Sequence, residues 1–106
     1  TAEVNGAAID FLVDTGASDI VLSRADAARI GFDLEKLAFL GSARTANGVV
    51  PIAYSRLKTI QLGPYLDQGI SVAINGGEME KSLLGMSYLG LFGRIEIAQD
   101  QLILRR

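Results

Sequence analysis

The sequence predicts a small, mainly β domain with one or two short helices. Two Asn-Gly dipeptides, Asn5-Gly6 and Asn47-Gly48, stand between β-favouring residues, and this dipeptide favours tight hairpins because both residues tolerate positive φ. The C-terminal stretch FGRIEIAQDQLILRR alternates apolar and polar residues, as strands with one buried face do. Only two stretches carry the marks of a helix, and both are short.

The first third of the chain predicts strands followed by the longer helix. EVNGAAIDFLV reads as two strands around the first Asn-Gly turn, and DIVLS as a further short strand. SRADAARIG predicts a helix with Ser23 as the N-cap, Asp26 as the acid of a capping box and Gly31 as the residue after the C-cap. FDLEKLAFL is compatible with either a turn of helix or a strand.

The rest of the chain predicts three hairpins and one helical turn. GSARTANGVVPIAYSRL forms a hairpin around Asn47-Gly48, and LKTIQLGPYLDQGISVAINGG a second strand pair joined through Gly63-Pro64. SLLGMSYLG combines an apolar run, a glycine and one helical turn, and the C-terminal stretch closes as a last hairpin. No linker separates these elements, so we expect one domain, residues 1–106.

Composition excludes several classes of protein. The net charge is −2 and the 10 basic residues are scattered, which gives no general attraction to nucleic acid or anionic lipid. The absence of Cys and His removes disulfides, zinc-finger sites and Ser-His triads, and we expect no metal and no other cofactor. Apolar residues make up 49% of the chain, but no run approaches the ~18–20 residues of a membrane span.

FLVDTGAS, residues 11–18, carries a carboxylate to the end of an apolar strand. Removing an ionised carboxylate from water costs several kcal/mol unless hydrogen bonds or a shared proton offset it. Asp14 is therefore a turn residue, a satisfied acid or a functional acid. The tripeptide Asp-Thr-Gly alone favours a plain Asx-turn. However, SLLGMSYLG has a similar arrangement, an apolar run followed by a glycine, and its Gly85 stands 71 positions after Asp14.

With these two segments in place, the chain resembles the retropepsin-like aspartic proteases, especially the bacterial single-domain members related in plan to retroviral proteases. FLVDTGAS looks like their active-site loop, TANG like their flap hairpin, and LLGMSYL like the glycine and helix that pack beneath the catalytic loop. The resemblance runs from about Val4 to the end of the chain. It implies a small closed β-barrel with a flap hairpin.

The resemblance also implies an activity and its residues. Amide hydrolysis without a metal needs one group that takes a proton from water and one that gives a proton to the carbonyl oxygen, and two carboxylates sharing a proton do both. Asp-Thr-Gly occurs once in this chain, so the second carboxylate is expected from a second copy, in a homodimer required for activity that buries the two Asp14 side chains against each other. The implied residues are catalytic Asp14, the loop residues Thr15 and Gly16, and substrate-binding Ala17, Ser18, Ala46, Asn47 and Gly48.

We therefore expect an aspartic endopeptidase acting on a peptide or protein substrate. Two alternatives stay open: a retropepsin-fold module that dimerises or binds peptides without cleaving them, and an unrelated β domain in which Asp14 is only a turn residue. Ile20, Leu22, Val49 and Leu84 are expected in the core or in side-chain subsites. Relatives of this kind are often anchored in the inner membrane of the cell envelope and face the periplasm, and such an anchor is expected from a segment outside this chain.

Overall fold

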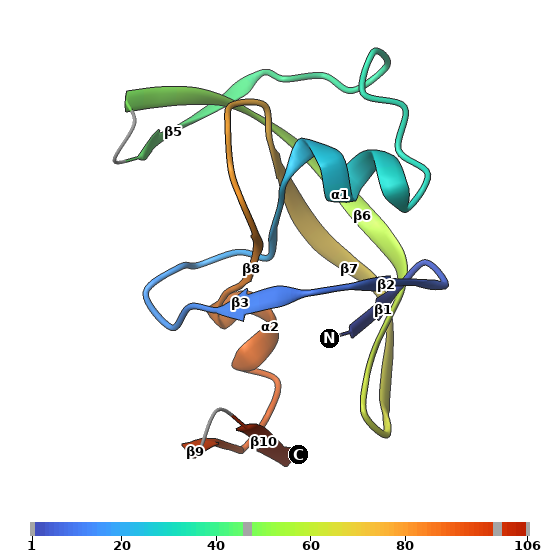
Figure 1. Cartoon of the computed structure of the whole chain (residues 1–106), viewed down its shortest axis with the longest axis vertical. Coiled ribbons are helices and arrows are strands. Elements are labelled where there is room, and N and C mark those ends of the chain that lie inside the picture. Colours follow the sequence, from blue (N-terminus) through green and yellow to red (C-terminus); the bar gives the residue numbers. More distant parts are fainter. Residues whose placement is uncertain (1, 46–47, 99–100, 106) are drawn as a thin grey trace.

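The structure, a computed structural model, describes residues 2–45, 48–98 and 101–105. In these residues it contains ten strands and two short helices (Figure 1). The mainly β class with two short helices is confirmed. In chain order the elements are β1 (Ala2–Val4), β2 (Ala7–Ile9), β3 (Phe11–Val13), β4 (Val21–Leu22), α1 (Arg24–Arg29), β5 (Gly41–Thr45), β6 (Gly48–Leu62), β7 (Tyr65–Asn75), β8 (Ser82–Leu84), α2 (Met86–Leu89), β9 (Arg94–Ala98) and β10 (Gln101–Arg105).

The main sheet curls into a nearly closed barrel, as predicted. Its strands follow the order β2-β1-β6-β7-β4-β8-β3, with β5 added to β6. The two strands at the ends of this order, β2 and β3, succeed one another along the chain with only Asp10 between them. The last strand of the sheet is thus a continuation of the first, which brings the sheet back onto itself.

A parallel pair joins the two similar segments of the sequence. β3 pairs with β8 in the register Phe11 with Ser82, Leu12 with Leu83 and Val13 with Leu84, so each partner in β8 lies 71 positions after its partner in β3. The same spacing of 71 positions separates Asp14 from Gly85 in the two similar segments of the sequence. β4 lies on the other side of β8, antiparallel to it, and runs parallel to β7.

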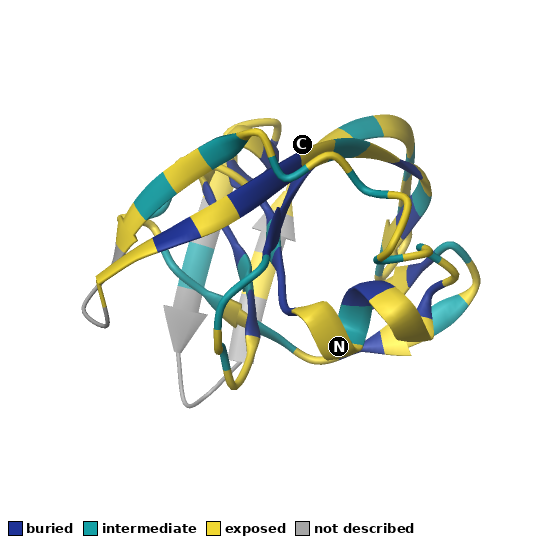
Figure 2. Cartoon of the chain, turned by 90° about the horizontal axis from the view of Figure 1, so that it is seen from above, coloured by how far each residue is buried: buried dark blue, intermediate teal, exposed yellow. Residues whose placement is uncertain are grey.

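The two hairpins predicted for the middle of the chain share one long strand. β6 pairs with β5 in the register Thr45 with Gly48, and its other end pairs with β1. Along most of its length β6 also pairs with β7, from Ile52 with Asn75 to Leu62 with Tyr65. Buried and exposed residues follow one another along these strands (Figure 2), which places one face of the hairpin in the core.

Helix α1 begins and ends at the predicted residues. The Ser23 hydroxyl accepts a hydrogen bond from the backbone N–H of Asp26 at 3.1 Å. Gly31 has φ +103°, its N–H donates to the carbonyl of Ala28, and the next N–H donates to Ala27, the two bonds of a Schellman motif. The following stretch FDLEKLAFL is neither helix nor regular strand, and contains one turn at residues 34–36 and a bend at residue 37.

The capping box predicted for Asp26 is closed through a third residue. The Asp26 carboxylate accepts a hydrogen bond from the hydroxyl of Ser82 at 2.6 Å, and that hydroxyl accepts one from the backbone N–H of Ser23 at 3.0 Å. In a simple capping box the acid reaches the N-cap N–H directly. Here the fully buried Ser82 stands between them and ties the start of α1 to the start of β8.

Most buried apolar residues form one core between the curled sheet, α1 and α2. Ile20, Leu22 and Leu84 belong to this core, whereas Val49 is exposed. β9 and β10 pair with each other in a separate two-stranded sheet. Within residues 2–45, 48–98 and 101–105, no helix has the length and apolar character needed to cross a membrane.

Candidate active site

Asp14 follows β3 and is held in a tight turn. Its backbone N–H donates to the carbonyl of Leu84 at 3.0 Å, which continues the β3–β8 ladder. One carboxylate oxygen, Oδ1, accepts the N–H of Gly16 at 2.9 Å, and the Asp14 carbonyl accepts the N–H of Ala17 at 3.1 Å. The side chain is half-buried. Its second oxygen, Oδ2, has no hydrogen-bond partner among the described residues.

The N-terminus of α2 supports this loop from below. The N–H of Met86 donates to the carbonyl of Ala17 at 2.8 Å, and the N–H of Ser87 donates to the carbonyl of Ser18 at 2.6 Å. Gly85 precedes the helix, and a Cβ added there would lie 2.2 Å from the carbonyl oxygen of Asp19. Only glycine permits this approach of two backbones. The predicted packing of the glycine and helix beneath the loop is therefore present.

The other predicted loop residues lie at the surface. Thr15, Gly16 and Ser18 are exposed, and Ala17 is half-buried. The hydroxyl of Thr15 has no hydrogen-bond partner in the described part of its own chain. The loop thus presents the Asp14 carboxylate and the Thr15 hydroxyl on an open edge of the subunit, although the sequence predicts a buried Asp14.

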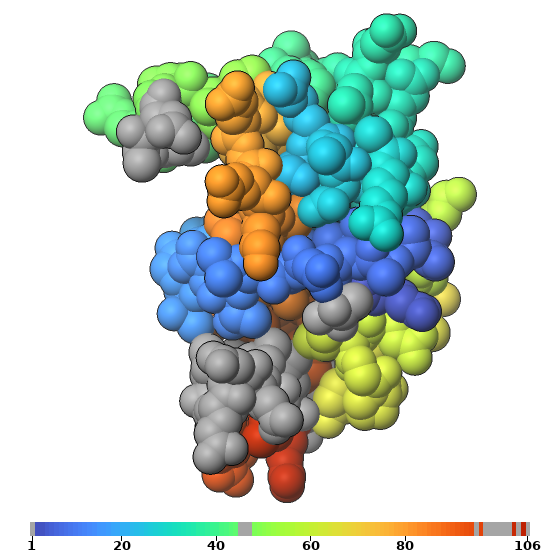
Figure 3. Space-filling view, viewed as in Figure 1, coloured from blue at the N-terminus to red at the C-terminus, as the bar shows by residue number. Residues whose placement is uncertain are grey.

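The predicted flap extends over the same edge. β5 and the start of β6 project on the side of the molecule where the Asp14 loop lies, and the outline of the molecule is hollowed between them (Figures 1 and 3). Gly48 opens β6 with φ +102°, and Val49 beside it is 67% exposed. Ala46 and Asn47, predicted to bind substrate, lie outside the described residues.

Local sequence patterns give no sign of the Leu84 carbonyl, which fixes the Asp14 backbone. A backbone acceptor leaves no signature in residue type, and only the 71-residue spacing of the two segments points to this contact. In the described ranges, no three Asp or Glu residues gather as the ligands of a metal ion would.

Comparisons with known proteins identify the family of this chain. A family model described as gag-polyprotein putative aspartyl protease matches residues 1–90. The crystal structure of a retropepsin-like aspartic protease from Rickettsia conorii superposes with a TM-score of 0.79 at 41% sequence identity, over 97% of this chain and 76% of that chain. The chain belongs to the retropepsin-like aspartic proteases. The retropepsin-like barrel predicted from the sequence is thereby confirmed.

Two further relatives of this retropepsin-like chain are uncharacterized bacterial proteins. An uncharacterized protein in the cobV 5′ region of Sinorhizobium sp. is 41% identical over 106 residues, 99% of this chain and 46% of that protein. An uncharacterized protein of Rickettsia prowazekii is 43% identical over 101 residues, 95% of this chain and 43% of that protein. The chain thus spans less than half the length of these two curated relatives.

Two more distant structures share the fold alone. EIAV protease in complex with an inhibitor has a TM-score of 0.69 at 19% identity, over 84% of this chain and 81% of that chain. A retroviral protease-like domain from Leishmania major has a TM-score of 0.70 at 14% identity, over 97% of this chain and 83% of that chain.

Proposed function

We propose that this chain is the subunit of a homodimeric aspartic endopeptidase in which Asp14 of each subunit is catalytic. The observation that carries the proposal is the difference in hydrogen bonding between the two carboxylate oxygens of Asp14. Oδ1 is held by the N–H of Gly16, whereas Oδ2 is without a partner among the described residues of the chain. The carboxylate is thus fixed in position and still has an oxygen available for water and a second acid.

Three features of the chain support a second copy as the partner. Asp-Thr-Gly occurs once in the sequence, and two other acids, Asp26 and Asp67, accept hydrogen bonds from Ser82 and Tyr88. The exposed Thr15 hydroxyl has no partner in the described part of its own chain, so it is available to bond to a second subunit. The β9–β10 hairpin forms a sheet of its own, and since an isolated two-stranded sheet is marginally stable, pairing with a second hairpin would stabilise it.

The proposed reaction needs only the two carboxyl groups and water. Two carboxylates about 3 Å apart share one proton, because like charges at that distance do not both ionise. The ionised Asp14 takes a proton from water as the water oxygen attacks the peptide carbonyl carbon, and the protonated Asp14 gives its proton to the carbonyl oxygen. As the tetrahedral intermediate collapses, one of its hydroxyl groups returns a proton to the ionised Asp14, the C–N bond breaks, and the leaving nitrogen takes the proton of the other Asp14, so the dyad again holds one proton.

The remaining predicted residues take positioning and binding roles in this proposal. Gly16, Ala17 and Ser18 line the floor of the cleft, and the flap residues Ala46, Asn47 and Gly48 close over an extended peptide, which excludes water from the reaction. Residues 1–106 form one catalytic subunit. Attachment to the cell envelope through a segment outside this chain stays a prediction.

The test is cleavage of a mixed peptide library across pH ~4–7 as a function of protein concentration. We expect the rate per subunit to rise with concentration and to level off when the dimer saturates, with the dimer observed by analytical ultracentrifugation over the same range.

Asp14→Asn is the control for contaminating proteases, since any cleavage that survives it does not come from this site. Tight binding of peptides by a stable dimer that cleaves none of them would overturn the proposal in favour of a non-catalytic peptide-binding module.

A further inference from the structure

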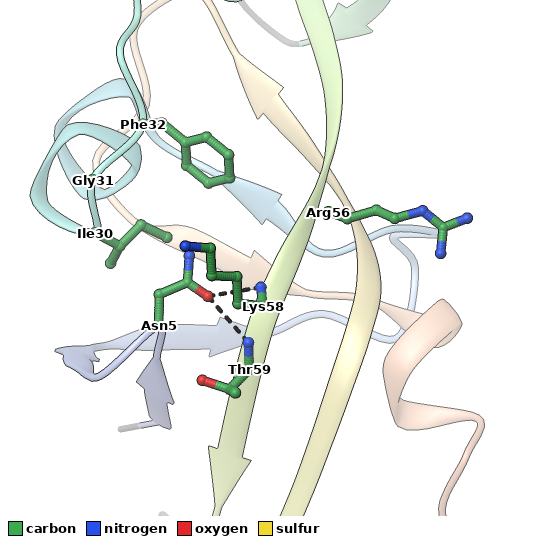
Figure 4. A pocket seen from close by; sticks show the side chains of 7 residues that line it. All are labelled: Asn5, Ile30, Gly31, Phe32, Arg56, Lys58 and Thr59. Atoms are coloured by element: carbon green, nitrogen blue, oxygen red, sulfur yellow. Dashed lines mark hydrogen bonds between the residues drawn. The ribbon is translucent and has the colours of Figure 1, made fainter.

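A second candidate site lies at the other end of the strands that carry Asp14. The turn between β1 and β2, the residues that follow α1 and the middle of β6 surround a hollow of about 440 Å³. This volume is in the range of small-molecule sites, about 300–1,000 Å³. Figure 4 shows its lining residues, which come from three segments far apart in the sequence. Figure 1 places this turn and the Asp14 loop at opposite ends of the β2–β3 stretch.

Asn5 presents a fixed pair of donors to this hollow. Its side-chain oxygen accepts the backbone N–H groups of Lys58 at 2.8 Å and Thr59 at 3.1 Å. These two donors determine which end of the amide is the oxygen, so the NH₂ group faces the other way. Asn5 has φ +49°, a conformation that Asn tolerates better than most residues, and its own N–H donates to the Thr59 carbonyl.

Lys58 lines the same hollow as Asn5. In Figure 4 the Lys58 side chain and the Asn5 amide nitrogen both point toward Ile30. Within the described ranges neither nitrogen has a hydrogen-bond acceptor. Two donors, one of them charged, thus line one hollow, and that combination favours an anionic acceptor with two oxygens. Arg56 points away in the same view and donates to the Gly69 carbonyl instead.

The walls of the hollow next to these donors are apolar. Ile30 is buried and the ring of Phe32 is half-buried. The nearby end of α1 does not supply competing acceptors from Ala27 and Ala28, because their carbonyls already accept the N–H groups of Phe32 and Gly31. A ligand that fits therefore carries an anionic group for Lys58 and Asn5 and an apolar group for the walls.

We propose that this hollow binds a carboxylate borne next to an apolar group, as at the C-terminal residue of a peptide or in a short aliphatic acid. The carboxylate bonds to the Lys58 ammonium and the Asn5 NH₂ group, and the apolar part packs on Ile30 and Phe32. The site does not use Asp14, so it stands or falls independently of the proteolytic activity.

The test is a titration of the full chain with N-acetyl-phenylalanine, followed by the NMR signals of the Asn5 side-chain amide and the Gly31 and Thr59 backbone amides. The matched probe is N-acetyl-phenylalaninamide, which has the same apolar group without the charge. We expect saturable shifts with the acid and at least tenfold weaker binding of the amide. Hexanoate separates the two ligand sources: tighter binding of the acetylated residue indicates a peptide end, and tighter binding of hexanoate an aliphatic acid.

Two variants examine the donors separately. Lys58→Met keeps most of the side-chain stem and removes the charge, and Asn5→Asp keeps the oxygen that accepts both backbone N–H groups and replaces NH₂ by a second oxygen. Each should weaken binding of the acid about tenfold or more, whereas Lys36→Met, outside the hollow, should not. Equal binding of acid and amide, undiminished binding by Lys58→Met, or no saturable shift at these residues would each overturn the proposal.

Discussion

Two aspartates of this chain make the same local turn in very different settings. Asp14 Oδ1 accepts the N–H of Gly16 at 2.9 Å, and Asp33 Oδ1 accepts the N–H of Glu35 at 3.1 Å. Both are Asx-type contacts between residues two apart, the kind that Asp makes in many loops. Judged by this bond alone, the two loops are equivalent.

The contacts of their backbones with the rest of the molecule distinguish them. The Asp14 N–H donates to Leu84 in β8, and α2 holds the next carbonyls of the loop at Ala17 and Ser18. In the described part of the chain, the Asp33 carbonyl accepts the N–H of Lys36, three residues on, in the irregular segment between α1 and β5. A turn motif therefore becomes a candidate for catalysis when distant segments fix its position, and the motif by itself does not make that distinction.

The largest expected effect comes from changing the two aspartates in parallel. Asp14→Asn and Asp33→Asn both keep a side-chain oxygen able to accept the local N–H, so both variants should fold. Asp14→Asn should lower peptide cleavage by roughly 10²–10⁴-fold, the usual contribution of general acid–base catalysis, and Asp33→Asn should leave it unchanged. Initial rates at a dimer-saturating concentration measure this. Equal losses in the two variants would contradict the assignment of Asp14.

The distant support of the Asp14 loop is removed by Gly85→Ala. The new methyl group would meet the Asp19 carbonyl at 2.2 Å, and because this atom belongs to the backbone, the loop has to shift. We expect a loss of about 3 kcal/mol in the free energy of unfolding, measured by urea denaturation, together with slower cleavage. Gly93→Ala is the matched control, since its nearest atom is 3.9 Å away. A well-folded, fully active Gly85→Ala would show that α2 does not position the loop.

A smaller effect is expected at the other end of β8. Ser82→Ala removes the hydroxyl that joins the Asp26 carboxylate to the Ser23 N–H, which leaves both groups without that partner. The cost should be about 2 kcal/mol of unfolding free energy. The exposed Ser71 provides the comparison, because Ser71→Ala should change stability by less than about 0.5 kcal/mol. Similar midpoints for the two variants in urea would mean that the bridge to α1 is not stabilising.

The smallest effect concerns the anchoring of α2. The buried Tyr88 donates to Asp67 Oδ2 at 3.0 Å and packs edge-on against Phe92 at 5.4 Å between ring centroids. Tyr88→Phe keeps the ring and loses the hydroxyl, so we expect the free energy of unfolding to fall by about 1 kcal/mol. Tyr54→Phe, at a residue that is 66% exposed, should be neutral. Thermal unfolding compares the stabilities of the two variants. A neutral Tyr88→Phe would show that the ring contacts, and not the hydrogen bond to Asp67, hold α2 in place.

The sequence predicts those elements whose signals are local. The Asn5-Gly6 turn, the Ser23 cap and the Gly31 C-terminus of α1 all follow from the conformational preferences of single residues, and all are present. Asp14 stands out for a similar reason, since an acid directly after an apolar strand is costly unless something satisfies it. The spacing of 71 residues also carried real information, because it equals the register of a parallel strand pair.

The features that local patterns did not predict depend on distant parts of the chain. The two middle hairpins share one strand because β6 pairs with β1, β5 and β7. The local residue pattern of β6 does not reveal these pairings. The insertion of Ser82 into the capping box of α1 joins positions 56 apart in the sequence. The half-buried state of Asp14 differs from the predicted burial because that prediction counted on a second subunit, which a single chain does not contain.

The parallel pairing of β3 with β8 also predicts an order of events during folding. Contacts between residues 71 positions apart close a large loop of chain, and the entropy lost in doing so makes such pairs slower to form than hairpins between neighbouring strands. The β6–β7 meander needs only a short turn. We therefore expect the Asp14 loop to become ordered in a late step of folding. Partly folded chains would then contain the Asp-Thr-Gly sequence without its fixed geometry.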